Sequence, residues 1–465
     1  KYTVSASFNS LNNKSIELSF SKSIKKILLF GKVGSGFGEN KFKVLDYTSP
    51  SKNIRAFNSP FDSKQAELSL HKSFGNQSVQ FHLFFADFKR QLSNSLTEVD
   101  KTSDQKDRIF RSVVQYDKNF KRTRITGLAG YTYDRINFKN DVVNDTGSIH
   151  VLLTKLEAEH NFRFLQVYQT FQSKFEFAEN SSYSKTVSRN ISSFINGISL
   201  LLLRNIKVNF ESRAEMIDGN SIILIAGGGL EGRYKKLILK SYISGSFNNP
   251  SLNDLYWVPG GNNSLTPERG INAGATITQD WTLGGLQNMT LIEGFYHNIN
   301  DWIQWVPNGN IWSPVNYKQV ISTGLNFKHK VSAKFKEHRF DLDFLFSLTR
   351  SLNKSRTPEA SFNKQLAYIP FVTGTTGLNY HFKEIFVGRI EMNAVGNRFS
   401  VFDESEYLSS YGLVNVSFGL KIRKGAYEFL PFIQINNVFN QYYESVAFRP
   451  REPRNFLLGI KLNIL

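Results

Sequence analysis

Residues 414–423 read VNVSFGLKIR, and every second side chain in this stretch is apolar. Asn, Ser, Gly, Lys and Arg occupy the alternate positions. Because successive side chains of a β-strand point to opposite faces, this pattern predicts a strand with one apolar and one polar face.

The same alternation recurs along the whole chain. Clear examples, each with polar or charged residues between the apolar ones, are residues 15–21, 64–71, 206–215, 339–349 and 455–465. A helical repeat of useful length is absent from the sequence. A β-sandwich also alternates, but its solvent face rarely sustains the pattern over so many strands. Such strands are typical of a membrane β-barrel with a lipid-facing exterior and a wet or plugged interior.

About 22 alternating segments can be counted. Their centres lie near residues 6, 18, 30, 69, 83, 112, 128, 153, 169, 196, 211, 227, 242, 273, 295, 322, 340, 371, 391, 417, 433 and 459. Odd-numbered connections are mostly long, as at roughly 35–63, 249–265 and 306–315. Even-numbered connections are short, as at Gly75-Asn76, Asn161, Asn205, Lys330 and Lys424-Gly425. Outer-membrane barrels have short periplasmic turns and longer outer loops. We therefore predict one all-β domain over residues 1–465, a large antiparallel transmembrane β-barrel of about 22 strands with both ends periplasmic.

The composition agrees with a barrel. Aromatic residues make up 14% of the chain and apolar residues 40%, and the mean hydropathy is −0.31. A transmembrane helix needs roughly 20 consecutive apolar residues, and the sequence has no such run. Because Cys is 0, disulfides, thiolate metal sites and cysteine nucleophiles are excluded together. Gly227-Gly228-Gly229 lies inside a strand pattern and should let the wall bend or approach a plug closely.

The net charge of +18 raises nucleic acid as a partner. Lys and Arg are spread over the whole chain, however, so we expect solvated faces or a polar lumen and no nucleic-acid partner. If the excess of Lys and Arg has a function, it is to attract anionic groups to the lumen or the mouth. Lys1 opens directly on an alternating segment without an initiator Met or signal peptide, and we expect the chain to have been processed or excised.

A loop rich in Asn, Gly and Pro interrupts the strands between residues 247 and 268. Its motifs resemble the mid-barrel signature of TonB-dependent outer-membrane receptors: an aromatic, an Asn-Pro, a Leu-Tyr pair and Asn-x-x-Leu-x-Pro-Glu. Here these are Phe247, Asn249-Pro250, Leu255-Tyr256 and residues 262–268. Three later pieces resemble the family in the same order, at residues 295–303, 368–370 and 436–454. The first half of the chain resembles the family only in the spacing of its predicted strands.

The resemblance implies a bacterial outer-membrane location and a barrel filled by an N-terminal plug, with energy supplied through TonB. The plug is absent from this sequence, so we expect one that was removed from this chain or is supplied separately. The implied partners are outer-membrane lipid, the plug, the TonB energy-transducing complex, a small-molecule ligand and a surface lipoprotein.

Residues 302–307 with residues 312–316 resemble the cobalamin-receptor-like branch of this family. The resemblance implies import of a bulky, scarce nutrient, with cobalamin first and a ferric siderophore second. A passive porin or a structural outer-membrane barrel is the alternative from a different class. The sequence has no nucleophile elbow, Walker loop or dinucleotide-binding turn, so no catalytic residue or cofactor is predicted.

Five aromatic residues near the outer loops are candidate ligand contacts, because flat, rigid rings bind large ligands at low entropic cost. They are Tyr256, Trp257, Trp302, Trp305 and Trp312. The alternative is the interfacial aromatic girdle that is common in barrels. A girdle suits Trp302 better than the other tryptophans, which lie further into the loops.

Metal binding is weakly supported. The 8 His are scattered without the spacing of metal ligands, and residues 247–268 contain none, which disfavours haem. The acids that could bind calcium are Asp46, Asp62, Glu98 with Asp100, and Asp141 with Asp145. No ordered calcium-loop pattern accompanies them, so we favour solvated loops and predict no metal site.

Overall fold

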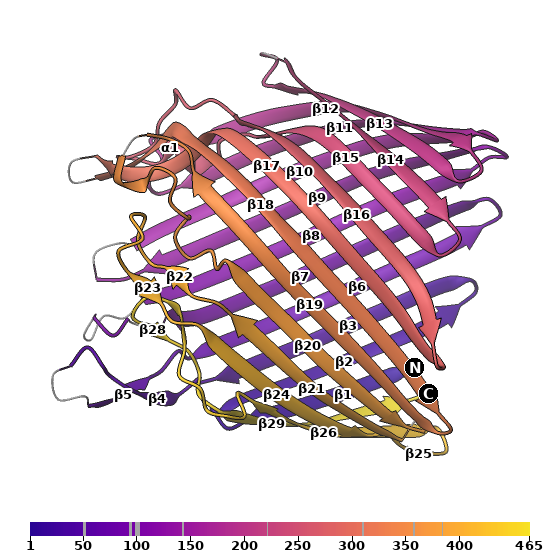
Figure 1. Cartoon of the computed structure of the whole chain (residues 1–465), viewed down its shortest axis with the longest axis vertical. Helices are drawn as coiled ribbons and strands as arrows, with labels where there is room; N and C mark the ends of the chain where they lie inside the picture. The colour runs from indigo at the N-terminus through magenta and orange to yellow at the C-terminus, as the bar shows by residue number, and fades with distance from the viewer. Residues whose placement is uncertain are drawn as a thin grey trace.

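The computed structural model describes residues 1–49, 53–92, 95–97, 103–141, 144–220, 222–308, 311–356, 359–383 and 385–465. Within these residues the chain forms a closed antiparallel β-barrel of 22 strands (Figure 1), which confirms the predicted fold. The segments β24 and β25 count as one barrel strand because both pair with β26. In the described part of the chain, no helix is both long and apolar enough to cross a membrane.

The wall strands follow one another in chain order around the barrel. They are β1 (Tyr2–Asn9), β2 (Asn13–Ile24), β3 (Ile27–Gly38), β6 (Phe61–Phe74), β7 (Gln77–Leu92), β8 (Ser103–Asn119), β9 (Thr123–Lys139), β10 (Asn144–Asn161), β11 (Leu165–Asn180), β12 (Val187–Leu203), β13 (Ile206–Ile217), β14 (Ile222–Tyr234), β15 (Leu237–Asn248), β16 (Glu268–Leu283), β17 (Leu286–Asn308), β18 (Ile311–Phe335), β19 (His338–Asn353), β20 (Val372–Phe382), β21 (Phe386–Val395), β24 (Tyr411–Leu420) with β25 (Ile422–Lys424), β26 (Tyr427–Asn436) and β29 (Asn455–Ile464).

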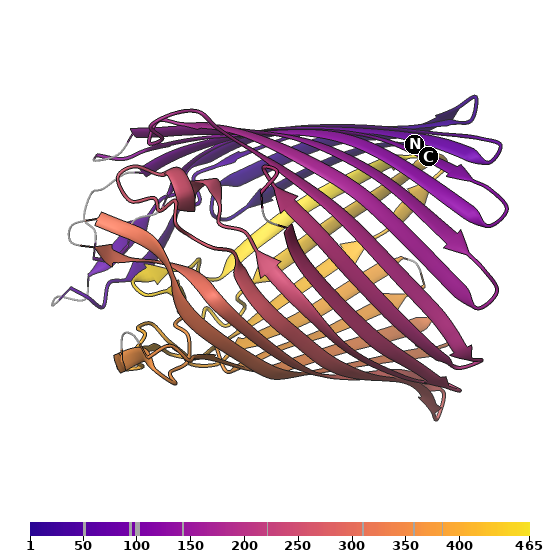
Figure 2. The same cartoon turned by 90° about the horizontal axis from the view of Figure 1, so that it is seen from above.

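The first and last strands close the barrel. β1 pairs with β29 in antiparallel register, with Tyr2 opposite Ile464. The two termini therefore lie side by side at the end of the barrel that carries the short turns, and the long loops gather at the other end (Figures 1 and 2). The predicted placement of both termini at the short-turn end is confirmed.

In the middle of β11, apolar side chains face outward and charged side chains face inward. Phe175 in β11 is 46% exposed, whereas its neighbour Glu176 is only 6% exposed. Glu176 forms ion pairs with Lys174 at 2.8 Å and with Arg189 of β12 at 2.7 Å. An exposed apolar face opposite a paired charged face is the reverse of a soluble sheet and suits a wall between lipid and a polar lumen.

The alternation located the strands accurately. Every predicted centre falls inside a barrel strand except residue 371, which precedes β20 by one position. Turns lie at Gly75-Asn76 and at Asn205, as predicted, while Asn161 and Lys424 are the last strand residues before their turns. Gly227-Gly228-Gly229 lies inside β14, as the sequence indicated.

Two predicted connections are wrong. Lys330 does not form a turn but lies inside β18, where its amine is 3.1 Å from the Asp343 carboxylate of β19. The turn follows six residues later, at Lys336, whose φ is +49°. The loop predicted over 306–315 is also mostly strand, because β17 and β18 continue beyond the wall as a paired two-stranded ribbon. In both places the residue types favour a turn, but pairing with the neighbouring strand keeps the backbone extended.

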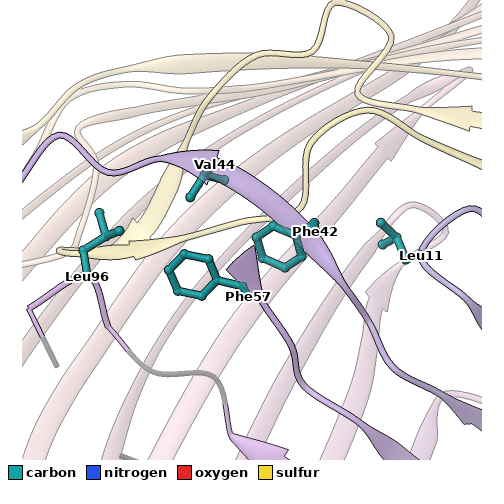
Figure 3. Close-up of a cluster of buried hydrophobic side chains, with 5 residues drawn as sticks. All are labelled: Leu11, Phe42, Val44, Phe57 and Leu96. Carbon is teal, nitrogen blue, oxygen red and sulfur yellow. The ribbon is translucent and has the colours of Figure 1, made fainter. Parts of the chain in front are cut away.

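The long loops have structure of their own. In the third connection, β4 (Phe42–Leu45) pairs with β5 (Ile54–Phe57). A small apolar cluster buries this hairpin against two neighbouring loops (Figure 3), and its members are Leu11, Phe42, Val44, Phe57 and Leu96. The Phe42 and Phe57 rings stack with centroids 5.5 Å apart. Two further small sheets, β22 (Arg398–Phe399) with β23 (Tyr407–Leu408) and β27 (Glu444–Val446) with β28 (Arg449–Pro450), order the loops near the C-terminus.

Candidate functional site

The loop between β15 and β16 contains one short helix, α1 (Leu252–Tyr256). Ser251 caps its N-terminus: the Ser251 hydroxyl accepts from the Asp254 backbone N–H at 3.1 Å. The Asp254 carboxylate in turn accepts from the Ser251 backbone N–H at 2.8 Å. This reciprocal capping box satisfies backbone donors that would otherwise lack partners, and it fixes where the helix begins.

The helix packs against the inner wall of the barrel. Leu252 is buried in a cluster with Ala178 of β11 and Val187 of β12. Ala178 lies three positions from the outward-facing Phe175 and therefore points to the opposite, lumenal face. Burial of a leucine side chain contributes roughly 1.5–3 kcal/mol, which holds the loop against the lumen wall.

Arg189 anchors the same loop through its backbone. Its guanidinium donates to the Pro250 carbonyl oxygen at 2.7 Å and to the Glu176 carboxylate at 2.7 Å. The Asn-Pro pair therefore ends β15 and presents a carbonyl to a charged group of the wall. Sequence reasoning missed Arg189, whose signal was only that of a charged residue inside an alternating strand.

Three of the five predicted aromatic residues lie in one cluster at the loop end of the barrel. The rings of Trp257 and Trp305 meet edge to face, with centroids 5.7 Å apart. The Trp305 indole N–H donates to the Asp254 carboxylate at 2.9 Å, on the oxygen that the capping box leaves open. The Tyr256 ring lies 6.4 Å from the ring of Tyr183, a residue that the sequence did not single out. We call Tyr183, Tyr256, Trp257 and Trp305 the aromatic cluster.

Trp302 and Trp312 lie apart from the aromatic cluster. Trp302 is half-buried at a β-bulge, opposite Lys318. Trp312 is 58% exposed on the β17–β18 ribbon. Among the described residues, no ring contact joins either tryptophan to the cluster. The structure therefore brings Tyr256, Trp257 and Trp305 together and leaves the other two predicted contacts outside.

The Asn-x-x-Leu-x-Pro-Glu block ties the loop to the ribbon. Asn262 donates to the Pro314 carbonyl oxygen at 3.0 Å. Asn316 accepts from the Thr266 backbone N–H at 2.8 Å and donates to the Thr266 carbonyl at 2.9 Å. The Glu268 carboxylate accepts from the Ile303 N–H at 2.8 Å. The polar residues of the motif thus hold the aromatic cluster in place.

A cavity of about 550 Å³ lies between α1 and the lumenal wall. Its apolar floor and charged edge are formed by Ile109, Ile136, Ile149, Leu252, Asp134, Glu176 and Arg189. Tyr183 lies at its edge, and its hydroxyl donates to Asn253. Burial, and then the charges of Asp145 and Asp254, raise the pKa of Tyr183 to about 12. The phenol is therefore a hydrogen-bond donor at every physiological pH.

Two of the candidate calcium acids, Asp46 and Asp145, accept hydrogen bonds from neighbouring loop residues. Asp46 accepts from the backbone N–H and hydroxyl of Thr48 at 2.9 and 2.6 Å. Asp145 accepts from the Asn180 amide at 3.4 Å. Glu98 and Asp100 lie outside the described residues. Across the described ranges, His, Asp and Glu side chains form no group of three that could hold a metal ion.

Gly260 allows the loop and the ribbon to meet. A Cβ atom at this position would lie 2.1 Å from the Trp312 backbone oxygen and 3.0 Å from the Trp257 ring. We expect Gly260→Ala to separate the two segments at a cost of about 1–3 kcal/mol. The near-ultraviolet circular dichroism of the Trp257–Trp305 pair should weaken, while Gly232→Ala, where nothing lies within 4 Å, should leave it unchanged. An undisturbed signal in Gly260→Ala would contradict this packing.

Comparisons with known proteins give one matching family model, one short sequence relative and several structures of similar fold. Residues 237–438 match the family model described as TonB dependent receptor-like, beta-barrel. The vitamin B12 transporter BtuB of Vibrio vulnificus (strain YJ016) is 28% identical over 116 residues, which cover 23% of this chain. The match spans 18% of the length of that curated relative.

Solved structures share the fold of the whole chain. The FrpB iron transporter from Neisseria meningitidis (F5-1 variant) superposes with a TM-score of 0.78 at 12% identity, over 99% of this chain and 81% of its own. The siderophore receptor PirA from Pseudomonas aeruginosa gives a TM-score of 0.70 at 12% identity, over 100% of this chain and 79% of its own. The family match covers the loop over 247–268, α1 and the ribbon, which carry three of the four residues of the aromatic cluster.

Proposed function

We propose that this chain, which carries the β-barrel of a TonB-dependent receptor of the bacterial outer membrane, belongs to an importer of a bulky, scarce nutrient and that the nutrient is cobalamin. The observation that carries the proposal is the aromatic cluster, held against the lumenal wall at the loop end of the barrel. Trp257 and Trp305 offer rigid faces, and the neighbouring cavity offers an apolar floor with charged edges. Such a surface can receive a large, flat ligand at low entropic cost.

One observation favours cobalamin over an iron chelate: the sequence relative from Vibrio vulnificus is named a vitamin B12 transporter. The loop over 247–268 contains no His, which disfavours haem as the ligand. A ferric siderophore is the second candidate, because Arg189 at the cavity edge and the net charge of +18 would attract an anionic chelate. The receptor PirA, which shares the fold, is itself named a siderophore receptor.

The proposed mechanism needs partners. The aromatic cluster would capture the ligand, a plug inside the barrel would block passive flow, and the TonB complex would supply the energy that moves the plug. A 22-stranded barrel encloses a lumen that must be filled to prevent leakage. A surface lipoprotein that delivers the ligand to the loops is a further proposed partner.

Calorimetric titration of the complete receptor with cyanocobalamin tests the ligand. We expect saturable binding with a Kd of about 1 μM or below, equivalent to at least roughly 8 kcal/mol. Saturable binding of a ferric siderophore instead would replace cobalamin with the second candidate. Binding of neither ligand, together with steady single-channel conductance of the complete protein, would replace the importer with a passive porin.

A further inference from the structure

The ten short turns of the barrel carry a strong excess of positive charge. They join the strands from β2–β3 to β25–β26 at the end where the two termini lie (Figures 1 and 2), and the short turns of an outer-membrane barrel face the periplasm. Their described residues are 25–26, 75–76, 120–122, 162–164, 204–205, 235–236, 284–285, 336–337, 383, 385 and 425–426. Among these described residues there are ten cations and one acid, Glu337. The cations are Lys25, Lys26, Lys121, Arg122, Arg163, Arg204, Lys235, Lys236, Lys336 and Lys383.

These cations are not neutralised by the protein itself. Within the described part of the chain, none of the ten forms an ion pair. On the lumenal wall, by contrast, charged residues are paired, as Glu176 is with Lys174 and Arg189. The charge of the short turns is therefore available to an anionic partner.

Five of the lysines occupy backbone positions that favour glycine. Lys25, Lys26, Lys235, Lys336 and Lys383 have φ angles of +46°, +66°, +53°, +49° and +51°. This left-handed region is costly for a residue with a Cβ atom, whereas glycine adopts it freely. Glycine does occupy it in other short turns, at positions 75, 284, 285 and 425. The turn geometry disfavours lysine, so an advantage of the side chain itself has to offset the backbone cost.

Exposed aromatic rings lie on the lipid-facing side of the same turns. Tyr234 is 65% exposed and Phe335 is 68% exposed. Tyr234 lies four positions from Leu230 in β14, and Phe335 lies ten positions from Leu325 in β18. Both rings therefore share the outward face of these exposed leucines. Aromatic side chains on this face settle at the boundary between hydrocarbon and headgroups.

A cation lies beside a ring at five of the turns. The distances from the cation to the ring centroid are 5.1 Å for Lys118 and Phe120, 4.9 Å for Arg163 and Phe164, 5.5 Å for Lys235 and Tyr234, 5.7 Å for Lys336 and Phe335, and 5.5 Å for Lys383 and Phe382. Long cationic side chains keep their stems along apolar surface and extend their charge into the polar layer. The cations thus lie at the height of the lipid phosphates of the periplasmic leaflet.

The cations are distributed around the barrel. Seven of the ten turns contain at least one among their described residues, from the β2–β3 turn to the β20–β21 turn. Because the wall strands follow one another in chain order, these turns span most of the circumference. A protein or a cell-wall polymer would contact one side of the rim, whereas a lipid leaflet surrounds every strand. The distribution therefore favours lipid as the partner.

We propose that the short turns bind the headgroup phosphates of anionic glycerophospholipids in the periplasmic leaflet, with Lys25, Lys26, Lys235, Lys336 and Lys383 as the principal contacts. The ring beside each turn anchors it at the hydrocarbon boundary, and the adjacent ammonium group pairs with a phosphate. A zwitterionic headgroup carries its own ammonium group, so the turns select anionic lipid. The site lies at the opposite end of the barrel from the aromatic cluster and does not depend on the ligand that the receptor imports.

The test uses the complete receptor in mild detergent, with palmitoyl-oleoyl phosphatidylglycerol as the probe. We expect native mass spectrometry to give a roughly tenfold lower affinity for Lys235→Asn/Lys336→Asn/Lys383→Asn than for the wild type. Asparagine tolerates the left-handed conformation, so the turns should keep their shape. The matched control is Lys41→Asn/Lys43→Asn/Lys185→Asn, which removes the same charge from exposed positions in the long loops and should change the affinity less than about twofold. Equal losses in both triple variants, or equal binding of phosphatidylethanolamine by the wild type, would overturn the proposal.

Thermal unfolding separates the charge from the fold of the turns. Without lipid, we expect the turn variant with three asparagines to have the same or a higher Tm than the wild type, because the backbone cost falls. Phosphatidylglycerol should raise the Tm of the wild type and of Lys235→Arg/Lys336→Arg/Lys383→Arg more than that of the asparagine variant. An equal rise in all three proteins would overturn the proposal. Retention of the wild type on purified cell-wall sacculi, lost in the asparagine variant and without any preference for phosphatidylglycerol, would instead assign the turns to a cell-wall polymer.

Discussion

Replacement of Trp305 with alanine is expected to weaken ligand binding by roughly 30-fold, the loss of about 2 kcal/mol that marks a hot-spot residue. Trp305 supplies the edge-to-face contact with Trp257 and donates its indole N–H to Asp254. Its loss removes one ring of the proposed ligand surface and one of the contacts between α1 and the ribbon. The measurement is calorimetric titration of the complete receptor with cyanocobalamin.

Two further variants separate these roles. Trp305→Phe keeps a ring but loses the donor to Asp254, so we expect an intermediate loss of affinity. Trp281→Phe is the matched control, because Trp281 lies near the short turns, where its indole N–H donates to Thr290 at 3.2 Å. An affinity that is unchanged in Trp305→Ala, with the Tm of the wild type, would show that the aromatic cluster does not contact the ligand.

Gly324→Ala is expected to lower the stability of the barrel by about 1–3 kcal/mol, the usual cost of overpacking. A Cβ atom at Gly324 of β18 would lie 2.3 Å from the Phe295 ring and 2.4 Å from the Leu348 backbone oxygen. The ring could rotate away, but the backbone oxygen belongs to the neighbouring strand and can move only with the sheet. Chemical unfolding in detergent, followed by tryptophan fluorescence, measures the effect.

The neighbouring strand offers a matched control. Gly294 of β17 lies opposite Leu325, one step from the Gly324–Phe295 pair, and nothing lies within 4 Å of a Cβ atom there. Gly294→Ala should therefore be neutral or slightly stabilising, since alanine restricts the unfolded chain. Equal destabilisation by both substitutions would mean that strand propensity, rather than the contact with Leu348, decides the outcome.

The sequence predicted the wall well because the strand signal is local. In residues 414–423 the apolar positions alone identify both the strand and its lipid face, without knowledge of its partners. The wrong turn at Lys330 has the same origin: the residue is compatible with a turn, and only its pairing with Asp343 of the next strand places it inside β18.

The site was less accessible from the sequence because it is assembled from distant segments. The motif over 247–268 marked the loop that carries α1, and Trp257 and Trp305, both predicted ligand contacts, lie in ring contact. Arg189 reaches a carbonyl 61 positions away, at Pro250, and no local pattern announces that contact. Tyr183 likewise contacts the Tyr256 ring only because α1 packs on the inner wall. Trp302 and Trp312 were proposed from their position near a loop that the structure shows to be a paired ribbon.

The loops on the outer end also reinforce the seam of the barrel. Among the 22 described strands, β1 and β29 are the neighbours that no turn or loop connects directly. Over this seam, Tyr47 donates to the Glu444 carboxylate at 2.8 Å, and the Leu96 backbone N–H donates to the Phe448 carbonyl at 2.7 Å. Hydrogen bonds thus connect loops from the first hundred residues to a loop from the last thirty residues. An outward movement of these loops would break contacts that bridge β1 and β29, the one pair of neighbouring strands without a direct covalent connection. Opening of the mouth and the mechanical stability of the barrel are therefore coupled.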